Sequence, residues 1–397
     1  MAAVAGKAKL IGAGLVLGAA VALLVIALGA RGSKTALDTQ VPAPLLPETT
    51  GALADVVLHY VPQVDPMLQE PYTDFLRAIG SDVSVAFVVP EGLSQDDRAL
   101  LDGRIAAIDP SGALAKRVRV VQSPGPITPW SKDRALVTKA PAPDQAAWLL
   151  ASAEPDRSRW PERYNDWLTV RSIAAASAGR YEAKAAPFDY DAGDFAVDGD
   201  RVIVDTNLLE KNRHRGIPDV GELGRRLRAW LGMPVIVLGR EPGDTPRHHL
   251  AMYMTPLRDK IMLVGDAGAG RQIVGEGFAP GELSSETGEP LRADFSDTMI
   301  ARFELAATEL ARNGYRVERV PNVPFDDKTY ISYTNGVFET RDGVAIAYVP
   351  IYGIPALDRE AHAVYERLGW EVRPVRVRNV YAHHGTIGCL VNVLGRR

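Results

Sequence analysis

The 397-residue sequence is poor in cysteine and in histidine, and it has no excess of positive charge. The single cysteine, Cys389, excludes an intrachain disulfide framework and a multi-cysteine metal cluster. Lysine and arginine number 45 against 49 acidic residues, a formal net charge of -4, so no positive field is available to hold a phosphate backbone. We therefore expect no nucleic-acid partner.

Histidine is limited to seven residues, four of which form the adjacent pairs His248-His249 and His383-His384. Adjacent side chains on a strand point to opposite faces, so neither pair makes a two-point metal clamp. The second pair also has no nearby carboxylate at ligand spacing. We expect no metal site.

The rest of the composition is ordinary for a folded chain, with 46% hydrophobic and 24% charged residues. These proportions exclude a disordered or collagen-like polymer. The length exceeds one average domain but is within reach of a single large α/β unit.

The amino-terminal region has one long apolar run. Two lysines precede an uncharged stretch over residues 10–30, and Arg31 and Lys34 close it. At about 1.5 Å of rise per residue, this run matches a hydrocarbon core of ~30 Å. We expect residues 1–34 to be a signal anchor or a cleaved signal peptide. The protein is then exported, either anchored in the membrane by this helix or secreted or periplasmic after cleavage. The proline-containing residues 35–55 are expected to be a linker.

Residues 56–397 alternate short β-branched runs with amphipathic helical patterns, which predicts an α/β domain. Three predicted helices end in a glycine turn followed by a strand, at residues 231–235, 313–317 and 368–372. This pattern predicts a repeated strand-strand-helix-strand unit. Residues 141–187 are rich in alanine and proline and do not continue this alternation of strands and helices. We expect an insertion near the functional site there.

One of the helical patterns, over residues 297–313, has a clear apolar face. Met299, Phe303, Ala306 and Leu310 lie on one side of it at helical spacing. A stripe of this kind predicts a helix packed on the core.

Each residue that could take part in catalysis is compatible with two roles. Cys389 is either inert packing before an apolar strand or a nucleophile whose approach Gly385 and Gly388 leave open. His249 follows a loop at a predicted strand entry, a place that suits a general acid/base or an exposed side chain.

Two acidic residues stand out because of their settings. Asp133 follows Trp130, and Asp194 follows an Ala-Gly turn. Carboxylates accept hydrogen bonds in the plane of a guanidinium group, whose five N–H donors they match. Each residue could equally be a turn residue or a helix cap.

The order of these stretches resembles that of a known family. The sequence is similar to the guanidino-group-modifying enzyme superfamily, the penteins, in Trp130-x-x-Asp133, Ala192-Gly193-Asp194, His249 and Gly385-x-x-x-Cys389. Its members include agmatine, arginine and peptidylarginine deiminases, dimethylarginine hydrolases and amidinotransferases. Two further stretches, at residues 330–336 and 349–353, look like the last module of the family.

The resemblance implies a five-bladed α/β propeller of ββαβ modules, preceded here by the amino-terminal transmembrane or signal helix. It implies that Cys389 is the nucleophile, that His249 is the general acid/base, and that Asp133 and Asp194 bind the guanidinium group. Trp130 and Gly385 are expected to contact the substrate, which is a small guanidino compound or a peptidyl-arginine. No metal and no organic cofactor is implied.

The implied reaction is a two-step hydrolysis. The Cys389 thiolate attacks the guanidinium carbon while His249 protonates the departing amine, which leaves a covalent S-alkylthiouronium. The same histidine then deprotonates a water molecule that cleaves this intermediate and releases a ureido product.

Two positions depart from the family pattern. Ala251 stands two residues after His249, where many members carry an aspartate, although dimethylarginine hydrolases also lack it. Gly388 stands before Cys389, where deiminases often have a histidine. The leading hypothesis is a deiminase-type hydrolase; the alternatives are an amidinotransferase, in which an amine replaces water, and a catalytically silent pentein that binds an arginine-like ligand.

Overall fold

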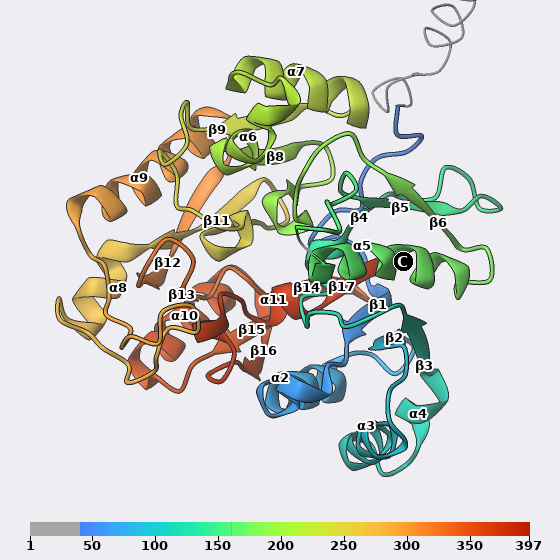
Figure 1. The fold of residues 1–397 in the computed structure, drawn as a ribbon. Helices are drawn as coiled ribbons and strands as arrows, with labels where there is room; N and C mark the ends of the chain where they lie inside the picture. Colours follow the sequence, from blue (N-terminus) through green and yellow to red (C-terminus); the bar gives the residue numbers. More distant parts are fainter. Residues whose placement is uncertain (1–39, 160) are drawn as a thin grey trace, which may run out of the picture. The chain divides into compact units, whose positions relative to one another are not determined.

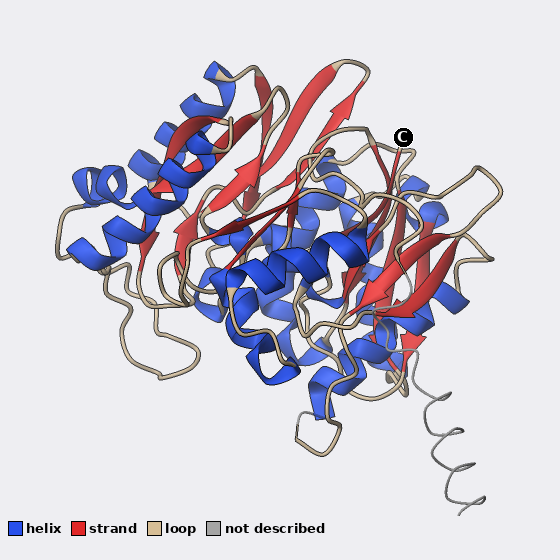
Figure 2. Cartoon of the chain, turned by 90° about the horizontal axis from the view of Figure 1, so that it is seen from above, coloured by secondary structure: helices blue, strands red, loops and turns tan. Residues whose placement is uncertain are grey.

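The computed structural model of the protein describes residues 40–159 and 161–397. The predicted signal segment, residues 1–34, lies outside the described residues. Within the described part of the chain, no helix has the length and apolar character needed to cross a bilayer. Residues 41–397 form one unit, in which helices and strands are interleaved throughout (Figure 2).

Five sheets make up this mixed α/β unit (Figure 1). In four of them, two consecutive strands pair antiparallel, a helical segment follows, and the next strand returns parallel to the second. The strands of these sheets are β4 (Ala135–Val137), β5 (Ala147–Ala151) and β6 (Tyr181–Ala185); β7 (Ala196–Val197), β8 (Val202–Asp205) and β9 (Val235–Leu238); β10 (Met254–Pro256), β11 (Ile261–Asp266), β12 (Arg316–Pro324) and β13 (Tyr330–Ser332); and β14 (Val337–Arg341), β15 (Val344–Ile351) and β16 (Trp370–Arg376). The predicted strand-strand-helix-strand unit is therefore present in each.

The fifth sheet joins distant parts of the sequence. β1 (Leu53–His59) pairs parallel with β2 (Ser84–Pro90), which pairs parallel with β3 (Val118–Ser123). β17 (Asn392–Arg396) completes the sheet by pairing antiparallel with β1, and Figure 1 shows the red β17 beside the blue β1. This pairing also fixes Cys389, which lies three residues before β17.

Helices connect the parallel strands. They are α2 (Asp65–Ala78), α3 (Gln95–Ile108), α4 (Ala113–Arg117), α5 (Pro161–Ala175), α6 (Thr206–Asn212), α7 (Val220–Leu231), α8 (Ala267–Val274), α9 (Asp297–Arg312) and α10 (Pro355–Arg367). The short α11 (Ile387–Leu390) instead precedes β17. Side-chain caps start several of them: the Ser296 hydroxyl accepts from the Met299 N–H at the start of α9. The predicted apolar stripe of α9 is buried, since Phe303 and Leu310 are both 0% exposed.

The predicted insertion at residues 141–187 was wrong. This stretch supplies β5, α5 and β6, which with β4 make one complete sheet with its helix. Its strands, AWLLA and YEAKA, contain no β-branched residue, so local propensity gave no strand signal. Trp167 of α5 packs in the core rather than over the site.

The predicted linker over residues 35–55 also differs from the structure in its described part. β1 begins at Leu53, and the segment before it packs on the domain: the Val41 N–H donates to the Trp230 carbonyl at 2.8 Å, and Leu45 is buried. Prolines favour an extended backbone, and here that extended backbone lies along the surface of two sheets instead of spanning open solvent.

Candidate active site

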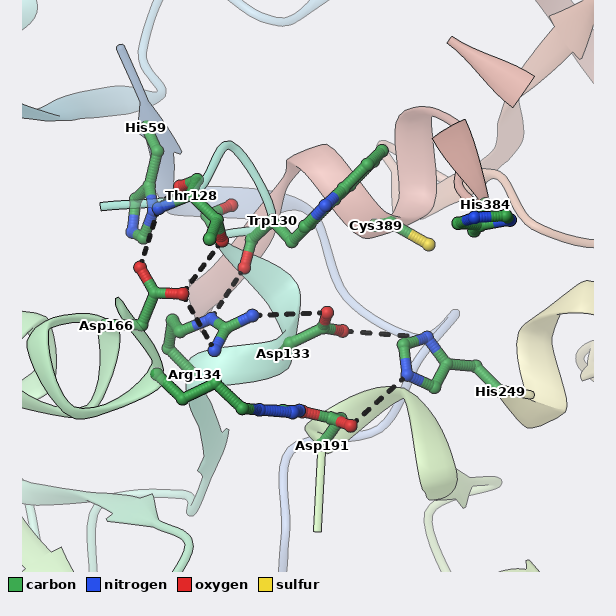
Figure 3. Close-up of polar contacts among 12 residues, drawn as sticks. His59, Thr128, Trp130, Asp133, Arg134, Asp166, Asp191, His249, His384 and Cys389 are labelled. Atoms are coloured by element: carbon green, nitrogen blue, oxygen red, sulfur yellow. Dashed lines mark hydrogen bonds and ion pairs between the residues drawn. The ribbon is translucent and has the colours of Figure 1, made fainter. Parts of the chain in front are cut away.

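Four of the predicted site residues meet at one cavity of about 230 Å³, because Trp130, Asp133, His249 and Cys389 all line it. They come from parts of the chain far apart in sequence. Asp133 lies on a one-turn 3-10 helix, η3 (Lys132–Arg134), which precedes β4, and Trp130 lies just before it. Figure 3 shows the Cys389 sulfur directed into the same space as the Asp133 carboxylate and the His249 ring.

Cys389 lies on α11, a single helical turn, and not in the continuous strand that the sequence predicts over residues 386–393. Its side chain is 4% exposed, and both it and His249 border the cavity. The turn places the sulfur at the wall of the cavity, while the strand that follows, β17, anchors the backbone. The cysteine is thus buried and still borders a cavity large enough for a flat cation.

The backbone around His249 determines where its ring lies. His249 is the N-cap of the 3-10 helix η6 (Leu250–Met252), and it is 4% exposed, so it is not the exposed side chain that its loop position allowed. Its ring stacks on His248, with the ring centroids 4.0 Å apart and an interplanar angle of 18°. On the other side lies Gly193, whose backbone approaches so closely that an added Cβ would lie 2.6 Å from the ring.

Two carboxylates flank the His249 ring (Figure 3). Its Nδ1 lies 3.6 Å from Oδ1 of Asp133, and its Nε2 lies 3.7 Å from Oδ2 of Asp191. Burial alone would lower the pKa of His249, but the Asp133 carboxylate and hydrogen bonds to Asp191 and Cys389 hold that pKa well above its ordinary value. The resting site therefore contains an imidazolium that can donate a proton.

Asp133 has an unused acceptor. Its Oδ2 lies 3.3 Å from Arg134, whereas its Oδ1 is buried and has no hydrogen-bond partner among the described residues. Burial raises the pKa of this carboxyl above its ordinary value, against the opposing effect of His249. A buried acceptor without a partner is costly, and a guanidinium group bound in the cavity would satisfy it.

The structure gives Asp194 a different place from the one predicted. Its Oδ2 accepts from Lys211 Nζ at 2.6 Å and from the Asp191 N–H at 2.9 Å. The cavity lining described here includes Asp191 but not Asp194. Asp194 therefore anchors the 3-10 helix η4 (Ala192–Asp194) rather than facing the cavity.

Asp191 is the acid that the sequence analysis missed. Its Oδ2 accepts from Lys211 at 2.9 Å, and Arg163 donates to its Oδ1. Burial would raise the pKa of Asp191, but Lys211, Arg163 and His249 hold it well below the ordinary value, so the group is charged. Asp191 and Asp194 flank the same Ala-Gly turn, and the only sequence signal was this pair of acids three residues apart.

Trp130 and Gly385 form one contact. An added Cβ on Gly385 would lie 2.4 Å from the Trp130 ring, so the indole packs directly on this glycine's backbone. Trp130 lines the cavity as predicted, but Gly385 is not part of the described lining. Gly385 thus makes room for the indole, and its contact with a substrate stays a prediction.

Ion pairs surround the cavity. Arg134 lies 3.3 Å from Asp133 and 3.1 Å from Asp166, and Arg163 is paired with Asp191. The acids that border the cavity are thus held by cations of the protein itself.

Replacing Gly193 with alanine is expected to lower kcat by roughly 10²-fold, because the new methyl group would push the His249 ring out of place, and a misplacement of about 1 Å has an effect of that order. Steady-state kinetics and thermal unfolding would measure the change and check that the fold persists.

Gly103→Ala is the matched control. An added Cβ at Gly103, on the exposed face of α3, meets no atom within 4 Å. Because alanine is favoured over glycine inside a helix, this variant should be at least as stable as the native protein and fully active. Equal kcat in the two variants would show that the position of the ring does not matter.

The fold matches solved structures of agmatine deiminases. The C. jejuni agmatine deiminase has a TM-score of 0.61 at 16% identity, over 89% of this chain and 97% of that chain. The agmatine deiminase of Enterococcus faecalis has a TM-score of 0.62 at 14% identity, over 90% and 98% of the two chains. No protein-family model and no curated protein matches the sequence. At these identities the likeness concerns the fold alone: this chain has a fold similar to that of the agmatine deiminases.

Proposed function

We propose that this chain, which has the fold of the agmatine deiminases, is a hydrolase that acts on a guanidino or amidino compound through Cys389. The observation that carries the proposal is the cavity where a cysteine sulfur, an imidazolium and an unsatisfied carboxylate oxygen meet. A guanidinium group is flat and cationic, with donors in its plane, and it complements these groups. We also propose that the five sheets are the blades of a propeller around this cavity.

In the first step, Asp133 and Asp191 hold the cation, and the Cys389 thiolate attacks the guanidinium carbon. The carbon then loses an amine, which takes a proton from His249 as it leaves. The product of this step is an S-alkylthiouronium on Cys389. In the second step, neutral His249 removes a proton from water, the resulting hydroxide attacks the same carbon, and the C–S bond breaks to release a ureido product and the free cysteine.

In this proposal, binding of the substrate cation does not require an acidic residue at position 251. Ala251 is the residue that departs from the family pattern, and its side chain has no charge to offer. Asp191 and Asp133 both line the cavity and supply two carboxylates next to His249. The two carboxylates therefore argue against the silent-protein alternative, whereas Ala251 is the observation in its favour. A direct test of reactivity decides between the two.

The activity is expected to depend on pH through His249 and Asp133. His249 must carry a proton, and its raised pKa means that kcat/KM falls only as the pH rises through a value well above the ordinary 6.5. Asp133 must be ionised to bind the substrate. Because burial raises its pKa, kcat/KM should begin to fall, as the pH is lowered, at a pH above the usual pKa range of aspartate. A pH profile of kcat/KM measures both limbs; an alkaline limb at or below pH 6.5 would contradict the assignment of His249.

The decisive experiment is to treat the protein with 2-chloroacetamidine, an amidine that alkylates a thiol next to a cation site, and to measure the intact mass. We expect one adduct at neutral pH, absent in Cys389→Ala and blocked by the guanidino compound that the enzyme hydrolyses. Agmatine, arginine, methylated arginine and an arginine peptide would be compared as protecting ligands and as substrates.

The result separates the three hypotheses. Formation of ammonia and a ureido product without an added amine supports the hydrolase, whereas dependence on an amine acceptor supports an amidinotransferase. Protection by a guanidine without turnover in either assay supports a silent binding protein. Failure of 2-chloroacetamidine to label the protein, under conditions that label a known deiminase, would overturn the proposed chemistry.

Export remains a proposal that rests on residues 1–34 alone. Cell fractionation of the full chain would test it, with the protein expected in the membrane fraction if the segment is retained and outside the cytoplasm if it is cleaved.

A further inference from the structure

Asn335 lies where the predicted strand over residues 330–338 is broken, in the turn between β13 and β14. Its side chain is buried, with 1% exposure, and both hydrogens of its amide point at sulfur atoms. Asn335 Nδ2 lies 3.0 Å from Sγ of Cys389 and 2.9 Å from Sδ of Met252. The side chain therefore links the cysteine to the helical turn that follows His249.

The backbone of Asn335 is tied to the same region. Its carbonyl accepts from the Thr386 hydroxyl at 2.6 Å and from the Gly388 N–H at 3.2 Å. These two donors lie on the turn that carries Cys389. Three hydrogen bonds therefore join Asn335 to the turn that carries Cys389. Two are accepted by its backbone carbonyl, and the third is donated by its side-chain amide to the sulfur.

Gly388 makes this contact possible. An added Cβ at position 388 would lie 2.1 Å from Oδ1 of Asn335 and 2.9 Å from the Gly336 carbonyl oxygen. Any side chain there would displace the amide from its place beside the sulfur. The glycine that departs from the family pattern and the asparagine at position 335 thus form one structural unit.

Asn335 contacts the sulfur without being part of the described lining of the cavity proposed for the substrate. It lines a second, smaller cavity of about 40 Å³, which Cys389 and His249 also border. The 230 Å³ cavity has Cys389 and His249 in its described lining but not Asn335. A change at position 335 should therefore affect the nucleophile more than the binding of a guanidinium group.

We infer that Asn335 is a positioning residue, which orients the Cys389 sulfur toward the substrate cavity and favours the thiolate by donating a hydrogen bond to it. Neutral amide donors stabilise an anionic acceptor more than a neutral one, and a carboxyl group at the same place would do the opposite. The inference rests on the proposed function in that Cys389 is the nucleophile, but it makes a statement about the sulfur that needs no substrate.

The test is the rate of Cys389 alkylation by iodoacetamide as a function of pH, followed by intact mass. In Asn335→Asp, which keeps the shape but replaces the donor with an oxygen, we expect the midpoint of the rate profile to move to higher pH by about one to two units. If a guanidino substrate is turned over, kcat should fall at least about tenfold, while KM stays within about twofold.

Gly388→Ala provides a second and independent variant, because it leaves the amide in the chain but moves it away from the sulfur. We expect a shift in the same direction. Asn322→Asp is the matched control: Asn322 is also fully buried, and its amide donates to the Met252 carbonyl oxygen at 3.1 Å and not to a sulfur. It should lose similar thermal stability without a change in the alkylation profile.

The outcomes distinguish this inference from the proposed function. If the alkylation profile shifts in both variants while the native protein hydrolyses no guanidino compound, the inference holds and the proposed function fails. If the native protein is active and the profiles of Asn335→Asp and Gly388→Ala match the native one, Asn335 has no such role. An equal shift in Asn322→Asp would also overturn the inference, because the effect would then be one of general destabilisation.

Discussion

Replacing Cys389 with alanine is expected to lower kcat/KM for the guanidino substrate by roughly 10⁴-fold or more, because the covalent route is lost and the sequence has no other thiol to replace it. Binding should survive, since Asp133, Asp191 and Trp130 are untouched. Product assays and calorimetric titration of the inactive variant would measure the two effects separately.

The control for this variant is Ser177→Ala, which also removes a small buried polar group, but in the turn after α5 and outside the cavity. It should keep full activity with a modest loss of thermal stability. Appreciable turnover by Cys389→Ala would exclude a covalent thiouronium, and loss of substrate binding would show that the sulfur is needed to shape the cavity.

Replacing Asp133 with asparagine is expected to raise KM and to lower kcat/KM by roughly 10²-fold, because a charged hydrogen bond to the substrate becomes a neutral one. The same change removes the carboxylate that raises the pKa of His249, so the alkaline limb of the pH profile should move to lower pH. Kinetics over a range of pH values would show both effects.

The fold should tolerate this change. Arg134 keeps a second carboxylate partner, Asp166, at 3.1 Å, and Asp133 itself is held in an environment that disfavours its charge. Asp102→Asn, at an exposed ion pair with Arg98 on α3, is the control and should leave activity unchanged. Equal kinetics for Asp133→Asn and the native protein would remove Asp133 from the site.

Part of this site could be predicted because its residues sit in short local patterns. Trp130 and Asp133 are three residues apart on one turn, and Cys389 follows Gly385 and Gly388, so their types and spacing were visible in the sequence. Their meeting at one cavity depends on the pairing of strands far apart in the chain, and only the resemblance to a family supplied that expectation.

Other features could not be predicted from local patterns. Asp191 and Asp194 flank the same turn, and Lys211 of α6 donates to both carboxylates, so the local sequence does not tell which of them borders the cavity. Asn335 was hidden inside an apparently continuous strand, because Tyr330 to Phe338 has β-forming residues on both sides of the break. In both cases tertiary contacts override the local preference.

The strands of residues 141–187 were missed for a different reason. The buried positions of β5 are filled by alanine and leucine, which have no strong preference for a strand, and β6 has one buried position, Tyr181. The parallel register of Ala147 to Ala151 with Tyr181 to Ala185 is imposed by the neighbouring helix and sheet. The sequence therefore gives no clear strand pattern over residues 141–187, although the structure has a regular strand-helix-strand unit there.

The pairing of β1 with β17 has a consequence for how activity arises during synthesis. Leu53 is paired with Arg396, so this pair of strands cannot form until nearly the whole described chain has left the ribosome. The nucleophile sits just before that closing strand and gains its surroundings in the same event. Partly made or truncated chains should therefore have an intact thiol but no activity, and recovery of turnover on refolding should follow the slow, long-range step and not the earlier appearance of secondary structure.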